Sequence, residues 1–215
     1  DSGGSMRTVL TGRTLLPTLD YAGWDGARHT LESAAFMSSE KSQGRKAALV
    51  SLWSRNCSPC LEELAAWTKA SAQLRSAGLT VLALSVDDLA PGAKSGGMAS
   101  NELLDRMGFP FASGRATIET LDTLELVQRT VVELQKSLPV PSSFLIDRAG
   151  RLAAMYRGPV ELVELLADVA HLSSSPEERR ASAVPYSGRF AARVFPPGPR
   201  AIAQAFENAG RHEEK

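Results

Sequence analysis

The sequence contains very little cysteine: Cys57 and Cys60 are the only two among 215 residues. A zinc site of four cysteines is therefore excluded. A zinc site of two cysteines and two histidines would need a pair of histidines a few residues apart in the sequence. The three histidines, His29, His171 and His212, are far apart in the sequence. A disulfide-held scaffold is excluded as well, because one bridge of such short span cannot staple a chain of this length. We expect no metal and no other cofactor.

The sequence also lacks an excess of one charge and any long apolar run. Its 24 Lys and Arg side chains balance 24 Asp and Glu side chains, so nothing indicates nucleic-acid binding, which leaves a basic footprint. No apolar run approaches the roughly 18 residues of a membrane-spanning helix, and no signal peptide is visible. Because the chain begins at Asp1 rather than Met, residues 1–11 are interpreted as a leader or as an expression-derived or trimmed end.

The hydrophobic pattern of the first half predicts a hairpin followed by a βαβ unit. Residues 15–31 are typical of a short β-hairpin with a turn at Asp25-Gly26. Residues 47–53 form a compact apolar run typical of a buried strand, and residues 61–76 have the period of a helix that ends near a glycine. Residues 79–86 are a second buried strand. A strand, a helix and a strand at this spacing indicate two parallel strands.

The second half of the pattern predicts further helices and strands. They are expected as helices at 101–107, 118–136 and 160–171, a short extended segment at 109–111, and strands at 142–147 and 152–157 joined by a turn. In the last helix, the spacing of Leu162, Val163, Leu166 and Val169 predicts that these side chains face the core.

The composition changes at residue 173, where a serine-rich stretch is followed by a charged tail. We assign residues 12–172 to one globular domain and residues 173–215 to a linker and tail. Residues 201–214 resemble the first helix and turn of a tetratricopeptide repeat, which needs neighbouring repeats to stack on. Two alternatives stay open: the chain is a piece of a larger multidomain protein, or the tail is a native amphipathic C-terminal helix.

The two cysteines lie in the motif Trp53-Ser-Arg-Asn-Cys57-Ser-Pro-Cys60, between a predicted strand and a predicted helix. A cysteine at a helix N-terminus faces unpaired backbone N–H groups and the positive end of the helix dipole, which favours the thiolate. Pro59 suits the first helical turn. We expect Cys57 to attack a substrate disulfide and Cys60 to resolve the mixed disulfide. A pair of ordinary buried cysteines is the alternative, and the βαβ context argues against it.

The motif and two other segments resemble a known family. Residues 47–63, read with 79–86 and with the segment Val140-Pro-Ser-Ser-Phe-Leu-Ile-Asp147, are similar to the TlpA/ResA-like branch of the thioredoxin superfamily, a redoxin or AhpC/TSA-like domain. The resemblance covers about residues 12–172. It implies an α/β thioredoxin-like fold: a central mixed β-sheet flanked by helices, with an N-terminal β-hairpin and an insertion after the first βαβ unit.

The same resemblance implies an activity and a place of action. Members of that branch help to reduce disulfides outside the cytoplasm. We therefore expect a thiol–disulfide oxidoreductase that acts in the periplasm or cell envelope. Its expected partners are protein thiols and disulfides and an upstream electron-donor protein.

Several residues around the cysteines are predicted to contact substrate. The resemblance implies that Pro141 is a cis-proline facing the disulfide, with Pro139 as the rival, although most X–Pro bonds are trans. The backbone of Val140 would then pair with an extended substrate chain. The remaining candidate substrate-binding residues lie in or beside the cysteine motif: Trp53, Asn56, Ser58 and Pro59.

Glu63 lies three residues after Cys60, one helical turn along. In some relatives a glutamate at this position assists proton transfer at the buried cysteine, and a carboxyl of raised pKa suits such general acid–base work. The alternative is a solvated surface glutamate like Glu62. Thioredoxin has a buried aspartate where this chain has Ser51, so proton transfer falls to Glu63 or to water.

Two further departures from relatives bear on the direction of the reaction. Many relatives have an aromatic residue where this chain has Asn56, so the rim is more polar, and Arg55 adds positive charge near the thiolate. Pro59 stands where a histidine would stabilise the thiolate and favour oxidation of substrates. Its presence favours a reductase or exchange role.

Two other kinds of function compete with this one. A thioredoxin-fold binding or regulatory module of a larger assembly, with weak redox activity, is the main alternative. A peroxidase is disfavoured, because the proline that peroxiredoxins carry seven residues before the cysteine is Val50 here. Asp87 and Asp88 follow a predicted strand as a lone acidic pair, which is typical of a solvated loop, and no metal is assigned to them.

Overall fold

The computed structural model describes residues 6–31, 47–89, 97–132, 134–183, 204–205 and 207–208. The polar stretch at residues 38–46, whose composition is typical of a loop, lies outside these residues. So does most of the repeat-like segment 201–214.

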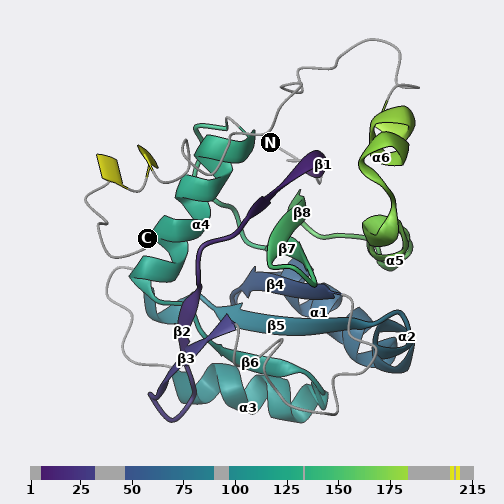
Figure 1. Ribbon diagram of the computed structural model, residues 1–215. Helices are drawn as coiled ribbons and strands as arrows, with labels where there is room; N and C mark the ends of the chain where they lie inside the picture. Colours follow the sequence, from purple (N-terminus) through teal and green to yellow (C-terminus); the bar gives the residue numbers. More distant parts are fainter. Residues whose placement is uncertain are drawn as a thin grey trace.

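A single mixed sheet of eight strands forms the centre of the protein (Figure 1), in the order β1-β8-β7-β4-β5-β6-β2-β3. The strands are β1 (Met6–Leu15), β2 (Asp20–Ala22), β3 (Arg28–Thr30), β4 (Ala47–Trp53), β5 (Leu79–Ser85), β6 (Ala112–Arg115), β7 (Ser142–Asp147) and β8 (Arg151–Arg157). Strands β4, β5 and β6 run parallel, whereas β7, β8 and β1 are antiparallel neighbours. The predicted βαβ unit, the β2–β3 hairpin and the thioredoxin-like fold are confirmed.

Helices cover both faces of the sheet (Figure 1). The helices are α1 (Ser58–Lys69), α2 (Ser71–Ser76), α3 (Gly97–Met107), α4 (Ile118–Val127), α5 (Leu162–Ala170) and α6 (Pro176–Ala183). One hydrophobic cluster joins α1, α2, α3 and α5 to one face of the sheet, and a second joins α4 to the other face. A π-helical turn, Gln128–Val132, continues α4.

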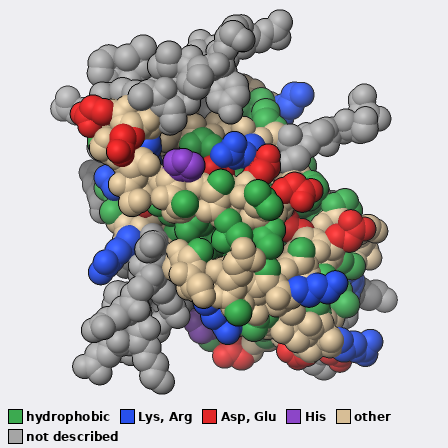
Figure 2. All heavy atoms as spheres, turned by 90° about the vertical axis from the view of Figure 1, so that its right-hand side faces the viewer, with side chains coloured by type: hydrophobic (Ala, Val, Ile, Leu, Met, Phe, Trp, Pro, Cys, Tyr) green, Lys and Arg blue, Asp and Glu red, His purple; other side chains and the backbone are tan. Residues whose placement is uncertain are grey.

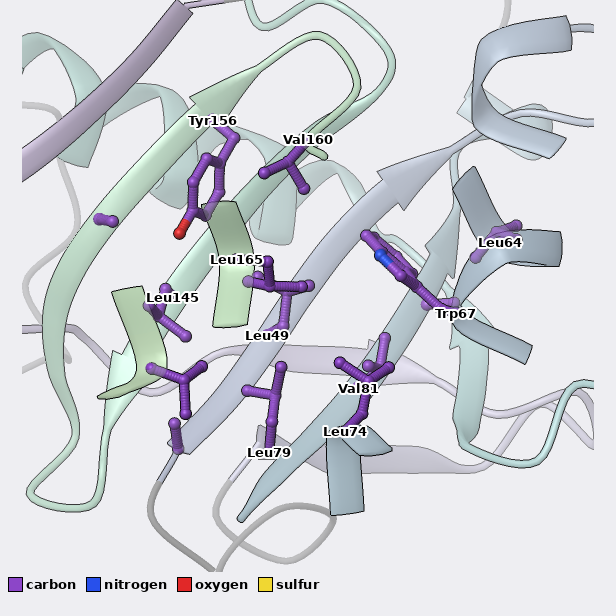
Figure 3. Close-up of a cluster of buried hydrophobic side chains, with 14 of the residues drawn as sticks. Leu49, Leu64, Trp67, Leu74, Leu79, Val81, Leu145, Tyr156, Val160 and Leu165 are labelled. Carbon is purple, nitrogen blue, oxygen red and sulfur yellow. The ribbon is translucent and has the colours of Figure 1, made fainter. Parts of the chain in front are cut away.

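Strand β4 lies at the centre of both clusters. Its seven residues are all buried, as expected for a central strand covered on both faces. Leu49 belongs to the cluster under α1, and Val50 belongs to the cluster under α4, because successive side chains of a strand point to opposite faces. Figure 3 shows Leu49 of β4 beside Leu165 of α5, with Trp67 of α1 in the same cluster of buried side chains. The core therefore fixes β4, and with it the cysteine motif that follows.

Two predicted helices have different limits in the structure. The helix expected at 61–76 begins at Ser58 and is divided into α1 and α2 at Ala70, whose φ and ψ of −91° and 13° leave the helical region. It is followed, as predicted, by a left-handed glycine, Gly78 (φ 82°). The helix expected at 118–136 changes to the π-helical turn at Gln128 and ends at residue 132.

Two other predictions at the level of elements are wrong. The extended segment is Ala112–Arg115, not 109–111; Phe109 and Phe111 instead pack edge to face, with ring centroids 5.6 Å apart. In α5, Val163 does not face the core but is 79% exposed, because the helix turns Leu165 and Asp168 inward. Figure 2 shows the side of the molecule that carries α5 and α6, where apolar side chains gather at the surface.

Strand β1 includes residues 6–11, which the sequence suggested as a leader. Residues Met6–Val9 pair with β8, and pairing resumes at Thr14 after an irregularity. The strand is half-exposed at the edge of the sheet, so apolar and polar side chains alternate only weakly along it. The sequence therefore contains no clear pattern that would predict a strand here. Helix α6, inside the expected linker, also contacts this strand: Arg179 Nε donates to the carbonyl oxygen of Thr11 at 3.2 Å. The folded region therefore extends beyond residues 12–172 on both sides.

Candidate active site

The two cysteines form a disulfide where β4 passes into α1. Their Cα atoms are 5.3 Å apart. Cys57 is the N-cap of α1, and its Sγ accepts a hydrogen bond from the backbone N–H of Cys60 at 3.2 Å. Pro59 lies in the first turn, as predicted, where a missing N–H costs no hydrogen bond. The positive end of α1 therefore points at Cys57.

The two cysteines differ in accessibility. Cys57 is partly exposed, whereas Cys60 is completely buried. This difference agrees with an attacking Cys57 and a resolving Cys60. Asn56, Ser58 and Pro59 are exposed around the disulfide, so they are placed where a docked chain could touch them.

Trp53 does not fit the expectation of substrate contact. Its side chain is completely buried in the cluster that also contains Cys60. The last residue of β4 therefore supports the cysteine motif from inside the core. Direct contact with a docked protein is excluded in this conformation.

Pro141 lies opposite the disulfide. The Val140–Pro141 peptide bond is cis, as the resemblance implied, and the rival Pro139 carries no cis bond. The carbonyl oxygen of Val140 lies 3.7 Å from Cys57 Sγ, and Val140 is 39% exposed. The structure thus brings together two segments more than eighty residues apart in the sequence at one exposed place.

Glu63 is buried, unlike its neighbour Glu62. Only 6% of Glu63 is exposed, whereas Glu62 is on the surface. Its Oε1 accepts a hydrogen bond from the backbone N–H of Val160 at 2.7 Å. Burial raises the pKa of Glu63 to about 8, although the hydrogen bond from Val160 lowers it in part. Glu63 and Cys60 share the buried face of α1.

Asp87 lies near the site, although the sequence predicted only a solvated loop residue there. It is not a solvated acid, because its carboxylate accepts hydrogen bonds from Ser54 Oγ (2.6 Å), Ser85 Oγ (2.9 Å), Ser100 Oγ (2.7 Å) and the backbone N–H of Arg55 (3.2 Å). Burial alone would raise its pKa, but these hydrogen bonds outweigh burial and hold the pKa below its usual value. Asp87 therefore anchors the loop that leads from β4 to Cys57.

Metal-binding clusters and membrane-spanning helices are both absent from the part of the chain that the structure describes. Within it, no three His, Cys, Asp or Glu side chains come together as a metal-binding group. None of its helices combines the length and the apolar character that crossing a bilayer requires.

The fold and the site together define a thioredoxin-like protein with a redox-active disulfide. Residues 25–155 match the AhpC/TSA family, and the chain therefore belongs to this family. With the Cys57–Cys60 pair, this membership implies thiol–disulfide oxidoreductase activity. No curated protein matches the chain.

Solved structures of thiol–disulfide proteins share the fold. A secreted thiol–disulfide isomerase from Corynebacterium glutamicum is similar with a TM-score of 0.60 and 17% identity, over 81% of this chain and 96% of that chain. A DsbF homologue from Corynebacterium diphtheriae has a TM-score of 0.57 and 17% identity, over 79% and 95% of the two chains. A thiol:disulfide interchange protein from Chlorobium tepidum TLS has a TM-score of 0.55 and 17% identity, over 74% and 96%.

Proposed function

We propose that this protein reduces or exchanges disulfides of extracytoplasmic proteins, with Cys57 as the attacking thiol and Cys60 as the resolving thiol. The observation that carries the proposal is the pairing of an accessible Cys57 with a buried Cys60 at the N-terminus of α1. The exposed Val140 opposite Cys57 provides a place for an extended substrate chain to lie.

In the first step, the Cys57 thiolate attacks one sulfur of the substrate disulfide. A mixed disulfide forms between Cys57 and the substrate, and the other substrate sulfur leaves as a thiolate that takes a proton from solvent. In the second step, the Cys60 thiolate attacks Cys57 Sγ. The bond between Cys57 and the substrate breaks as the Cys57–Cys60 disulfide forms. The second substrate sulfur leaves as a thiolate that takes a proton from solvent, so two electrons have passed to the substrate. An upstream dithiol protein then reduces the pair again.

Glu63 is the proposed proton acceptor for Cys60 in the second step. Its pKa of about 8 lies close to the value of about 8.5 for an unperturbed thiol, so a carboxylate of this pKa is a suitable acceptor for a thiol proton. The buried face of α1 holds both residues away from solvent. Ser51 stands where thioredoxin has a buried aspartate, so that route of proton transfer is lost, which supports Glu63 as the acceptor.

Two further observations support the direction and the compartment. Pro59 takes the place of a histidine that would stabilise the Cys57 thiolate, which favours reduction of substrates. The similar protein from Corynebacterium glutamicum is described as secreted, in agreement with an extracytoplasmic role for this one.

Insulin reduction, followed with the wild type, Cys57→Ser and Cys60→Ser, tests the proposal. We expect the wild type to reduce insulin disulfides, Cys57→Ser to be inactive, and Cys60→Ser to accumulate mixed disulfide. The reduction potential measured against glutathione should lie near the thioredoxin value of about −270 mV, whereas a value near about −120 mV would indicate an oxidant. Intact partner binding without any cysteine-dependent activity would favour a binding module instead.

A further inference from the structure

The segment that leads to Pro141 is held by side chains of α4, the π-helical turn, β7 and β8. It runs from residue 134 to Val140 without regular secondary structure, between the π-helical turn and β7. Lys136 and Ser137 are exposed, and so is Val140, which contacts Cys57. The conformation of this exposed segment must therefore be fixed from its inner side.

Gln128 provides one inner anchor. It is the first residue of the π-helical turn, and its side chain is completely buried. Its amide nitrogen donates to the carbonyl oxygens of Leu134, at 3.3 Å, and of Lys136. Its amide oxygen accepts from Arg157 Nη1. Because the Gln128 amide donates both of its hydrogen bonds to backbone carbonyl oxygens, it fixes the path of the backbone. These contacts do not depend on the side chains of residues 134 and 136.

Arg157 provides the second anchor. Its Nη2 donates to the carbonyl oxygen of Ser137 at 3.1 Å. It is the last residue of β8 and lies opposite Ser142 of β7. The next residue, Gly158, donates its N–H to the carbonyl oxygen of Pro141 at 2.8 Å. The end of β8 thus holds the chain on both sides of Val140.

We infer that Gln128 and Arg157 are positioning residues that set the conformation of residues 134–140 and thereby the affinity for extended protein disulfides. This inference rests on the proposed function, because it assumes that substrate lies along Val140. Neither side chain is placed at the disulfide, and Gln128 is buried. Their loss should therefore weaken the binding of a peptide chain but leave the chemistry of Cys57 and Cys60 unchanged.

Arg157→Met and Gln128→Glu test the inference by their effect on two substrates. The glutamate keeps an acceptor for Arg157 but loses both donors to Leu134 and Lys136. For insulin, we expect KM to rise about tenfold in each variant with kcat nearly unchanged, since a misplaced loop weakens ground-state and transition-state binding alike. For the small disulfide 5,5′-dithiobis(2-nitrobenzoate), the second-order rate constant should change less than about twofold. The reduction potential of Cys57–Cys60 should equal the wild-type value.

Two matched variants complete the test. Arg151→Met removes an arginine at the other end of β8, where its Nε donates to Asp147 at 3.0 Å, and should leave KM for insulin at the wild-type value. Arg157→Lys keeps a cationic donor and should recover part of the affinity, and it also serves if Arg157→Met does not fold.

Three results would overturn the inference: unchanged KM for insulin, an equal loss toward both substrates, or a shifted reduction potential. A wild type that reduces neither substrate would contradict the proposed function as well. A fully active wild type with unaffected variants would contradict only the positioning role of Gln128 and Arg157.

Discussion

Glu63 makes the stability of the protein depend on pH in an unusual direction. Its pKa is about 8 in the folded protein and near 4.5 in an unfolded chain, so between these values the folded state binds more protons. The free energy of unfolding must then fall as pH rises through this window. We expect a loss on the order of 3 kcal/mol between about pH 5 and pH 8. Urea unfolding of the oxidised protein at several pH values measures this slope.

Glu63→Gln should remove this contribution. The amide stays neutral at every pH and keeps an oxygen that can accept from Val160, so at pH 8 the variant should be the more stable protein. Glu62→Gln is the matched control, because Glu62 is exposed on the same helix, and it should keep the wild-type slope. Parallel stability curves for wild type and Glu63→Gln would show that Glu63 is ionised at neutral pH.

At the scale of single residues, a site residue could be predicted when the sequence pattern that marks it is confined to one short segment. Cys57, Cys60 and Pro59 are set by one short motif at a strand–helix junction, and sequence alone placed them correctly. Asp87 could not be found this way, because its partners Ser54 and Ser100 come from separate segments. An acidic pair after a strand looks the same in sequence whether it is solvated or fully hydrogen-bonded.

At the scale of elements, one buried network holds α5 onto the sheet. Tyr156 of β8 donates its O–H to Asp168 Oδ2 of α5 at 2.6 Å, and Arg7 Nε of β1 donates to the same oxygen at 2.8 Å. Burial and the neighbouring Asp168 carboxylate raise the pKa of Tyr156, so the phenol stays protonated and donates at all ordinary pH values.

Tyr156→Phe should weaken this attachment of α5. The ring still fills its place in the core, but the buried Asp168 carboxylate loses a charge-assisted hydrogen bond, which costs about 1.5–3 kcal/mol of unfolding free energy. Urea unfolding measures the change. Tyr21→Phe offers a comparison within the second core cluster, and we expect a smaller effect there because no carboxylate among the described residues accepts a hydrogen bond from that hydroxyl. Equal losses in the two variants would contradict the special role of the Tyr156–Asp168 bond.

The limits of the elements were harder to predict than their existence, for local physical reasons. Pro110 has no backbone N–H to give to a sheet, so the strand begins after it at Ala112. The carbonyl oxygen of Pro110 instead accepts from Arg75 at 2.7 Å. In α5, the inward position went to Asp168 rather than to Val163, because Asp168 has partners in Arg7 and Tyr156. A pattern of apolar residues contains no information on such a pair.

At the scale of the whole molecule, β1 is an edge strand of the sheet and begins at Met6, before residue 12, where the sequence predicted the domain to start. This edge strand was missed because it is half-exposed and contains no continuous apolar run. The strand stabilises the domain in two ways. It pairs with β8, and the guanidinium of its Arg7 neutralises Asp168. The Asp168 side chain is only 4% exposed, so water cannot readily replace this arginine.

Deleting residues 1–11 should therefore destabilise the whole domain. Deleting only residues 1–5 is the matched control, because it leaves the pairing of Met6–Val9 and the side chain of Arg7 in place. The longer deletion removes the pairing of Met6–Val9 and leaves Asp168 buried without its cation, for which we expect a loss of about 3–5 kcal/mol. Unfolding in urea, monitored by circular dichroism, compares both with the full chain. Asp168→Asn in the longer deletion should recover part of the loss, because a neutral amide needs no cation but still accepts from Tyr156. If the longer deletion were as stable as the full chain, the domain would begin at residue 12 after all, and β1 would be an accessory strand.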